Sequence, residues 1–174
     1  AEAKLEDSLE IGLYRILVLF AAFECVALAG ITVYKNRARR AGRMIGMLFL
    51  CFGIWLFSFS HYFQSIGHDA AWFWAKLTLG MAIMNAVLYL HAVLAYVEEP
   101  PRRSVPVLIA GYAVAFIFEL LLVTDRLVVD LRRQAYLDHY PVVQPLLYAL
   151  LALHILIWPA YALVLQYMKL KQFT

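Results

Sequence analysis

The sequence predicts an all-α, polytopic membrane protein folded as a bundle of five transmembrane helices. Of its 174 residues, 64% are hydrophobic and only 16% are charged, whereas a soluble domain is near half apolar and about a quarter charged. The mean hydropathy is +0.74, and the apolar residues fall in long runs almost free of charge. The runs lack the alternation of about ten residues that is typical of a membrane β-barrel.

Five runs are long enough to cross a membrane. They cover residues 11–34, 43–66, 71–97, 105–124 and 141–168. At about 1.5 Å of rise per residue, a helix of about 20 residues crosses the hydrocarbon core. Helices are expected because a backbone in contact with lipid must satisfy its hydrogen bonds within the segment. We therefore predict an acidic periplasmic tail at 1–10 and a single transmembrane domain at 11–174.

The first three spans carry polar or small residues at regular spacing. The first span holds Glu24 near its middle, and the second repeats Gly46, Gly53 and Ser60 every seven residues, which favours close approach of a neighbouring helix. In the third span one face of the helix is more polar than the rest, and it holds Thr78, Asn85, Tyr89 and Tyr96. We interpret that face mainly as a surface for packing against other helices, with ligand binding as the alternative.

The remaining elements complete the bundle. The fourth span is apolar apart from Glu119, and the fifth carries His154 and Pro159. Between these spans, residues 125–140 are expected to form an amphipathic element on the outer surface. Its membrane-facing residues would be Leu127, Val128, Leu131 and Ala135.

The distribution of charge predicts the orientation. The basic residues gather in three segments on one side, as Lys35, Arg37, Arg39, Arg40, Arg43, Arg102, Arg103, Lys169 and Lys171. Segments on the other side are acidic or balanced, so the positive-inside rule places the N-terminus in the periplasm and the C-terminus in the cytoplasm of a bacterial inner membrane. The acidic start lacks the basic region of a cleavable signal peptide.

Ionisable and amide groups within the spans are candidate functional residues, because such groups are unfavourable in lipid. They form two layers. The outer layer, a candidate ligand-binding pocket, holds Arg15, His61, Lys76 and Glu119, and the central layer holds Glu24, Asn85 and His154. Arg15 and Lys76 are also close enough to a helix end to extend their charges into the headgroups. Glu24 is too deep for that, so we expect it either to pair with His154 or Asn85 or to form a ligand or proton site.

Cofactor and catalytic signals are weak. A haem- or pigment-contacting role would use His61, His91 or His154, but these lie at three different depths, so no cofactor is expected. No metal-ligand spacing or catalytic motif is present in the sequence, which predicts no enzyme. The two cysteines, Cys25 and Cys51, read as small core residues, and a net charge of +3 is too small to indicate nucleic acid.

From Lys35 onward the sequence resembles the seven-transmembrane N-terminal sensor region of bacterial histidine kinases and diguanylate cyclases. The resemblance rests on the basic loop "KNRARRAGR", on Trp55, on "FWAKL", on "HAVLAYVEEP", and on Thr124 and Asp125 at the end of a span. It is partial, because five spans are present and no kinase or cyclase segment follows. It implies a membrane-embedded input module with Trp55, Phe73, Trp74 and Lys76 near the outer side as scaffold or pocket residues.

Two functions remain open. One is a sensory or ligand-binding membrane module whose output belongs to another chain. The other is a non-catalytic accessory subunit of a respiratory or photosynthetic membrane complex. Either function places the chain in the lipid bilayer, with other membrane protein chains or a second copy of itself as partners.

Overall fold

A computed structural model describes residues 2–62, 65, 67–97, 104–134 and 137–171 of the chain. Within these residues five α-helices are long and apolar enough to cross a membrane, and most of the described residues are helical. The helices are α1 (Glu2–Asn36), α2 (Arg40–Tyr62), α3 (His68–Tyr96), α4 (Ser104–Val123) and α5 (Pro145–Lys171); an antiparallel hairpin of β1 (Val128–Gln134) and β2 (Leu137–Val143) precedes α5. The predicted all-α bundle of five membrane-spanning helices is confirmed.

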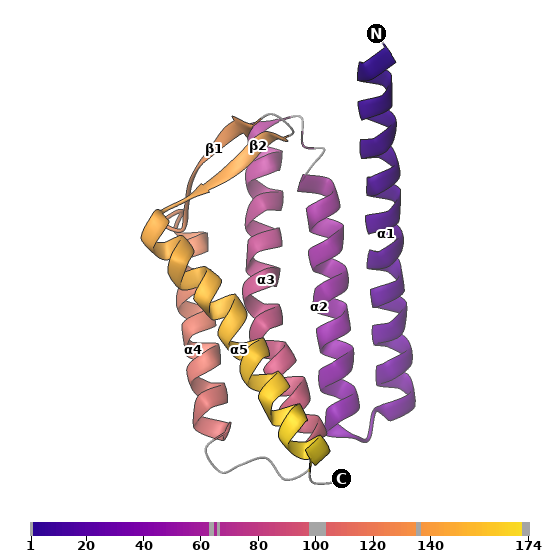
Figure 1. Cartoon of the computed structure of the whole chain (residues 1–174), viewed down its shortest axis with the longest axis vertical. Helices are drawn as coiled ribbons and strands as arrows, with labels where there is room; N and C mark the ends of the chain where they lie inside the picture. Colours follow the sequence, from indigo (N-terminus) through magenta and orange to yellow (C-terminus); the bar gives the residue numbers. More distant parts are fainter. Residues whose placement is uncertain (1, 63–64, 66, 98–103, 135–136, 172–174) are drawn as a thin grey trace.

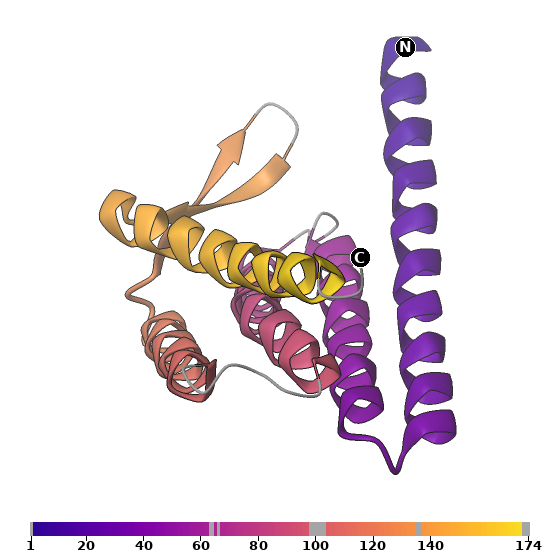
Figure 2. The ribbon, with the colours of Figure 1, turned by 60° about the horizontal axis from the view of Figure 1, so that its bottom comes forward.

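Helix α3 is the centre of the bundle (Figure 1). It packs against α2, α4 and α5, and it also contacts both strands of the hairpin. Of its most apolar stretch 56% is buried, against 11% for α1. Helix α1 packs chiefly against α2 and stands at the edge of the molecule (Figure 2). Most of the surface of α1 is therefore left uncovered by the rest of the chain.

The helices alternate in direction, which separates two ends of the bundle. The start of α1, the end of α2 and the hairpin lie at one end, and the end of α1, the start of α4 and the end of α5 lie at the other (Figure 1). We name these the outer end and the inner end, after the predicted orientation.

Small residues hold α1 against α2, as the seven-residue repeat in the second span predicts. A Cβ atom added at Gly46 would overlap with Cγ2 of Val33, and one added at Gly53 would lie 3.1 Å from the carbonyl oxygen of Ala22. Ala22 and Ala29 are buried on the facing side of α1. The two backbones therefore approach at a distance that larger side chains would prevent.

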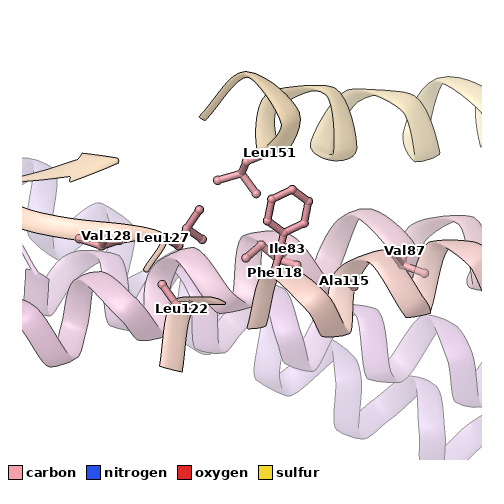
Figure 3. Close-up of a cluster of buried hydrophobic side chains, with 8 residues drawn as sticks. All are labelled: Ile83, Val87, Ala115, Phe118, Leu122, Leu127, Val128 and Leu151. Atoms are coloured by element: carbon pink, nitrogen blue, oxygen red, sulfur yellow. The ribbon is translucent and has the colours of Figure 1, made fainter. Parts of the chain in front are cut away.

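The main hydrophobic cluster joins α3, α4 and α5 to the start of the hairpin (Figure 3). It consists of Ile83, Val87, Ala115, Phe118, Leu122, Leu127, Val128 and Leu151. Nearer the inner end a second cluster joins α3 to α5, through Leu90, Val93, Leu94, Ala162 and Leu165. These clusters explain why α3 is more buried than any other helix.

Two helices differ from the predicted spans at their starts. The membrane span Gly12–Asn36 agrees with the predicted 11–34 within two residues, and α1 itself continues outward to Glu2, since no Pro or Gly interrupts the sequence from Glu2 to Ile11. Helix α5 begins at Pro145 rather than at 141, because β2 continues to Val143. Proline is favoured in the first turn of a helix, because the N–H groups of that turn have no intrahelical acceptor. Pro145 therefore marks the start of α5 within a largely apolar run.

The segment after α4 is a β-hairpin and not an amphipathic surface element. Leu127 and Val128 are buried in the main cluster instead of facing the membrane, and Leu131 is half-buried on β1. Ala135 lies outside the described residues. The residue types that favour strands here are Val128 and Val129 in β1 and Tyr140, Val142 and Val143 in β2.

Candidate functional site

A cluster of three polar side chains lies at the outer end of the contact between α3 and α4. We call this helix–helix contact the seam. The ammonium of Lys76 on α3 forms an ion pair with Asp125, which follows α4. The indole Nε1–H of Trp72 donates to Oδ1 of the same carboxylate at 3.1 Å, and the Lys76 ammonium lies 5.4 Å from the centre of the Trp72 ring. Trp72 and Lys76 are one turn apart on α3, so a single carboxylate joins both to the end of α4.

The backbone conformation at Asp125 directs its carboxylate towards Lys76 and Trp72. Asp125 has a positive φ of 58°, and its N–H donates to the carbonyl of Leu122 at 3.3 Å while that of Arg126 donates to Leu121 at 2.9 Å. This is the Schellman arrangement that ends a helix, with Asp125 at the left-handed position usually taken by Gly. The hydrogen bond from Lys76 is the main reason that the pKa of Asp125 is lowered from its ordinary value.

Glu119 lies deeper in the same seam. Its carboxylate oxygens lie 3.0 Å and 3.3 Å from the position that a Cβ atom would occupy at Gly80 of α3. The carboxylate therefore fits where Gly80 has no side chain, one helical turn inward from Lys76. Its Oε1 atom is buried and has no hydrogen-bond partner among the described residues.

The structure does not bring the four residues of the predicted outer pocket together. His61 at the end of α2 stacks on Trp74 of α3, with ring centroids 4.7 Å apart. Trp74 and Lys76 are two residues apart, hence about 160° apart around the helix, so His61 and Lys76 lie on different sides of α3. Of the predicted four residues, only Lys76 and Glu119 share a seam.

Arg15 belongs to a third location, the contact between α1 and α2. Ala29 of α1 faces Gly46 of α2, and Ala22 faces Gly53. Seven residues further along each helix, the same pattern places Arg15 opposite Ser60. Arg15 Nε and Ser60 Oγ are both buried without a hydrogen-bond partner among the described residues. The outer layer is thus divided among three helix contacts.

In the central layer, His154 fixes α5 to α3. Its Nδ1 accepts a hydrogen bond from Nε1 of Trp158 at 2.8 Å, and its Nε2 lies 3.2 Å from the carbonyl oxygen of Ile83. Since Nδ1 is an acceptor, the proton is on Nε2 and is donated to Ile83. Asn85 is 6% exposed, and neither its amide oxygen nor its nitrogen has a hydrogen-bond partner among the described residues.

The prediction that Glu24 pairs with His154 or Asn85 was wrong. Glu24 is exposed on α1, while His154 lies on α5 and Asn85 on α3, and α1 packs chiefly against α2. The side chain is also on the wrong face for burial, because Glu24 and the buried Ala22 are two residues apart and therefore about 160° apart around the helix.

The histidines considered for haem have other roles in this arrangement. His91 Nδ1 lies 2.9 Å from the hydroxyl of Tyr112 on α4, and its Nε2 lies 3.3 Å from the guanidinium of Arg40. Both nitrogens of His154 are likewise engaged. Either ring would have to give up a hydrogen bond before it could become an axial ligand.

Sequence reasoning missed Asp125 and Trp72 as members of the outer cluster. Asp125 was read as part of a connection with balanced charges, and only the adjacency of α3 and α4 reveals its partner. The available signal was an Asp directly after an apolar run, together with Trp and Lys at i, i+4 near the start of another span.

The fold is that of a multi-pass membrane protein. Its central helix, α3, is linked to α5 by a buried hydrogen bond of His154 and to the end of α4 by the ion pair of Lys76 with Asp125. No protein family, curated protein sequence or solved structure matches the chain.

Proposed function

We propose that the chain is a sensory or ligand-binding input module of the bacterial inner membrane, with no catalytic step of its own. The candidate site is the outer half of the seam between α3 and α4. The observation that carries this proposal is the Glu119 carboxylate, which has a buried and unpartnered oxygen beside Gly80. A buried carboxylate oxygen without a donor is unfavourable, so a ligand that supplies a donor would be stabilised there.

The chemistry of the site favours a small ligand with an ammonium or another hydrogen-bond donor. Lys76 and Asp125 form the rim above Glu119, and their ion pair is partly open to solvent, since the side chain of Asp125 is 55% exposed. A cationic ligand could pass this rim by exchanging partners with Asp125. Occupation of the seam would act on α3, which contacts α2, α4 and α5.

The proposed orientation has the site facing the periplasm. The basic segment at 35–43 joins α1 to α2 at the inner end of the bundle (Figure 1). Lys76, near the start of α3, and Asp125, just after α4, belong to the outer end. This distribution supports a cytoplasmic inner end under the positive-inside rule.

The test is thermal unfolding of the purified chain in lipid nanodiscs with a panel of small monoamines, polyamines and quaternary amines. A true ligand at about a hundred times its Kd stabilises the protein by about 2.7 kcal/mol. We expect at least one amine to raise the unfolding midpoint of the wild type and of Glu24→Gln, a matched loss of a carboxylate elsewhere, but not of Glu119→Gln. A shift that persists in Glu119→Gln, or a panel without effect, would overturn the proposal.

A second candidate is the accessory subunit of a larger membrane complex. The exposed Glu24 in the middle of α1 favours it, because a carboxylate at that depth needs a partner that the described part of this chain does not supply.

A further inference from the structure

Glu24 lies at the midpoint of a membrane-spanning helix. The apolar span of α1 is Gly12–Asn36, and Glu24 is its central residue. Twelve residues of helix on either side place it about 18 Å from both ends of the span, while half of the hydrocarbon core is about 15 Å. A side chain with two methylenes cannot carry its carboxyl group to the headgroups from there, in contrast to a long Lys or Arg.

The face that carries Glu24 is turned away from the rest of the protein. Around Glu24, within about 40° on the helix, lie Leu17, Phe20, Leu28 and Ile31, which are 59%, 62%, 45% and 52% exposed. Among the described residues, no side chain forms a hydrogen bond or an ion pair with Glu24. We refer to these five residues as the Glu24 face.

Lipid chains cannot satisfy this group, because they contain no hydrogen-bond donor. Ionisable residues within membrane helices almost always face a partner or a water-filled cavity. A mid-membrane carboxylate surrounded by large apolar side chains is complementary to a helix that has an Arg or Lys at the same depth and apolar residues around it.

A second copy of the chain is a poor occupant. Two copies with the same membrane orientation, packed symmetrically through the Glu24 face, would bring two Glu24 carboxylates together at one depth, without a cation. The nearest basic residue on this side of α1 is Lys35, at the inner end and eleven residues, or about 16 Å, away along the helix. A symmetric second copy therefore brings no cation to this face at the depth of Glu24.

We propose that the Glu24 face binds a transmembrane helix of another membrane protein through an ion pair between Glu24 and a basic residue at mid-membrane depth. This surface lies on α1, whereas the candidate ligand site lies between α3 and α4. The proposal deepens the accessory-subunit candidate and does not depend on the ligand site.

The experiment is site-specific photocrosslinking in native membranes. Benzoylphenylalanine replaces Leu28 on the Glu24 face, and the matched control replaces Leu156, which is 68% exposed near the middle of α5. We expect Leu28, and not Leu156, to give an adduct with a different membrane protein that has an Arg or Lys in the middle of a spanning helix. Glu24→Leu should reduce this adduct roughly tenfold or more, as expected when one partner of a buried charge pair is lost.

A charge exchange makes the test specific. Glu24→Lys should abolish the adduct, and changing the partner's basic residue to Glu should restore it in the Glu24→Lys background. An adduct with a second copy, adducts with lipid alone, a partner without a mid-membrane basic residue, or an adduct unaffected by Glu24→Leu would each overturn the proposal.

A separate measurement excludes an internal role. The purified Glu24→Leu protein should unfold at the wild-type midpoint or above it, since the carboxylate has no partner among the residues that the structure describes. A lower midpoint would mean that Glu24 stabilises this chain itself, which contradicts the proposal. Amine-induced stabilisation of the purified protein tests the ligand site alone, so failure of either proposal can be recognised separately.

Discussion

Trp158 donates its indole hydrogen to Nδ1 of His154, one turn away on α5, at 2.8 Å. The imidazole is therefore held with its own hydrogen on Nε2, directed at the carbonyl of Ile83 on α3 at 3.2 Å. Both polar atoms of a buried ring are used within the protein, and the ring also packs against Phe118. The central histidine links two helices.

Replacing this histidine should weaken the contact between α3 and α5. His154→Leu removes both hydrogen bonds and leaves the Trp158 N–H without its acceptor, so we expect a loss of about 1–3 kcal/mol in the free energy of unfolding. Titration with SDS in mixed micelles measures this change. Leu156→Ala, at a nearby exposed position, is the control and should stay within about 0.5 kcal/mol of wild type.

The contact between α1 and α2 should depend on a missing side chain at Gly46. Gly46→Ala places a Cβ atom against Val33, and overpacking of this kind costs about 1–3 kcal/mol. Gly30→Ala is the control, because its Cβ meets nothing within 4 Å and alanine favours the helix by up to about 1 kcal/mol. Adding Val33→Ala should rescue Gly46→Ala but not improve the wild type, measured by the same SDS titration.

The repeat that carries this prediction was readable from the sequence, whereas the position of Glu24 relative to other helices was not. Small residues every seven positions identify one face of one helix, and the contact is local because α1 and α2 are consecutive. Whether α1 also meets α3 or α5 depends on how the helices are arranged around one another, which periodicity does not encode. The expected pairing of Glu24 with His154 failed for this reason.

The same distinction applies to the outer cluster. Lys76 was recognised because it interrupts an apolar run, and its depth near a helix end was readable. Its partner Asp125 lies beyond the next span, and its aim depends on a left-handed backbone position at the end of α4. In most helices a Gly at this left-handed position marks the helix end in the sequence. Here the position is occupied by Asp125, so the sequence did not indicate the turn.

Replacing Asp125 by Asn should separate its charge from its backbone role. Asn accepts the left-handed conformation about as well as Asp, so Asp125→Asn should keep the end of α4 and lose the ion pair with Lys76. The pKa of Asp125 is lowered in the folded protein, so its stabilising effect is complete above the ordinary carboxyl pKa of about 3.9. That effect is lost as the pH falls through the lowered value.

The wild type should therefore lose more stability than Asp125→Asn between about pH 5 and the acid limit of folding, as measured by thermal unfolding at several pH values. Because Asp125 is exposed, the difference should be small and should shrink in high salt. An identical pH dependence of the two proteins at low salt would show that the ion pair contributes nothing to folding.

The hairpin should depend on Leu127, which is fully buried in the main cluster together with Val128 (Figure 3). Leu127→Ala removes buried apolar volume where α3, α4 and the hairpin meet, and such changes cost about 2–5 kcal/mol. Val129→Ala, at a position that is 47% exposed, is the control and should have little effect. Tryptic cleavage after Arg126, which follows the outer cluster directly, should become faster in Leu127→Ala and not in Val129→Ala, because local opening exposes the chain there. Equal cleavage rates would mean that the end of α4 is held by the Lys76–Asp125 contact without support from the core beneath it.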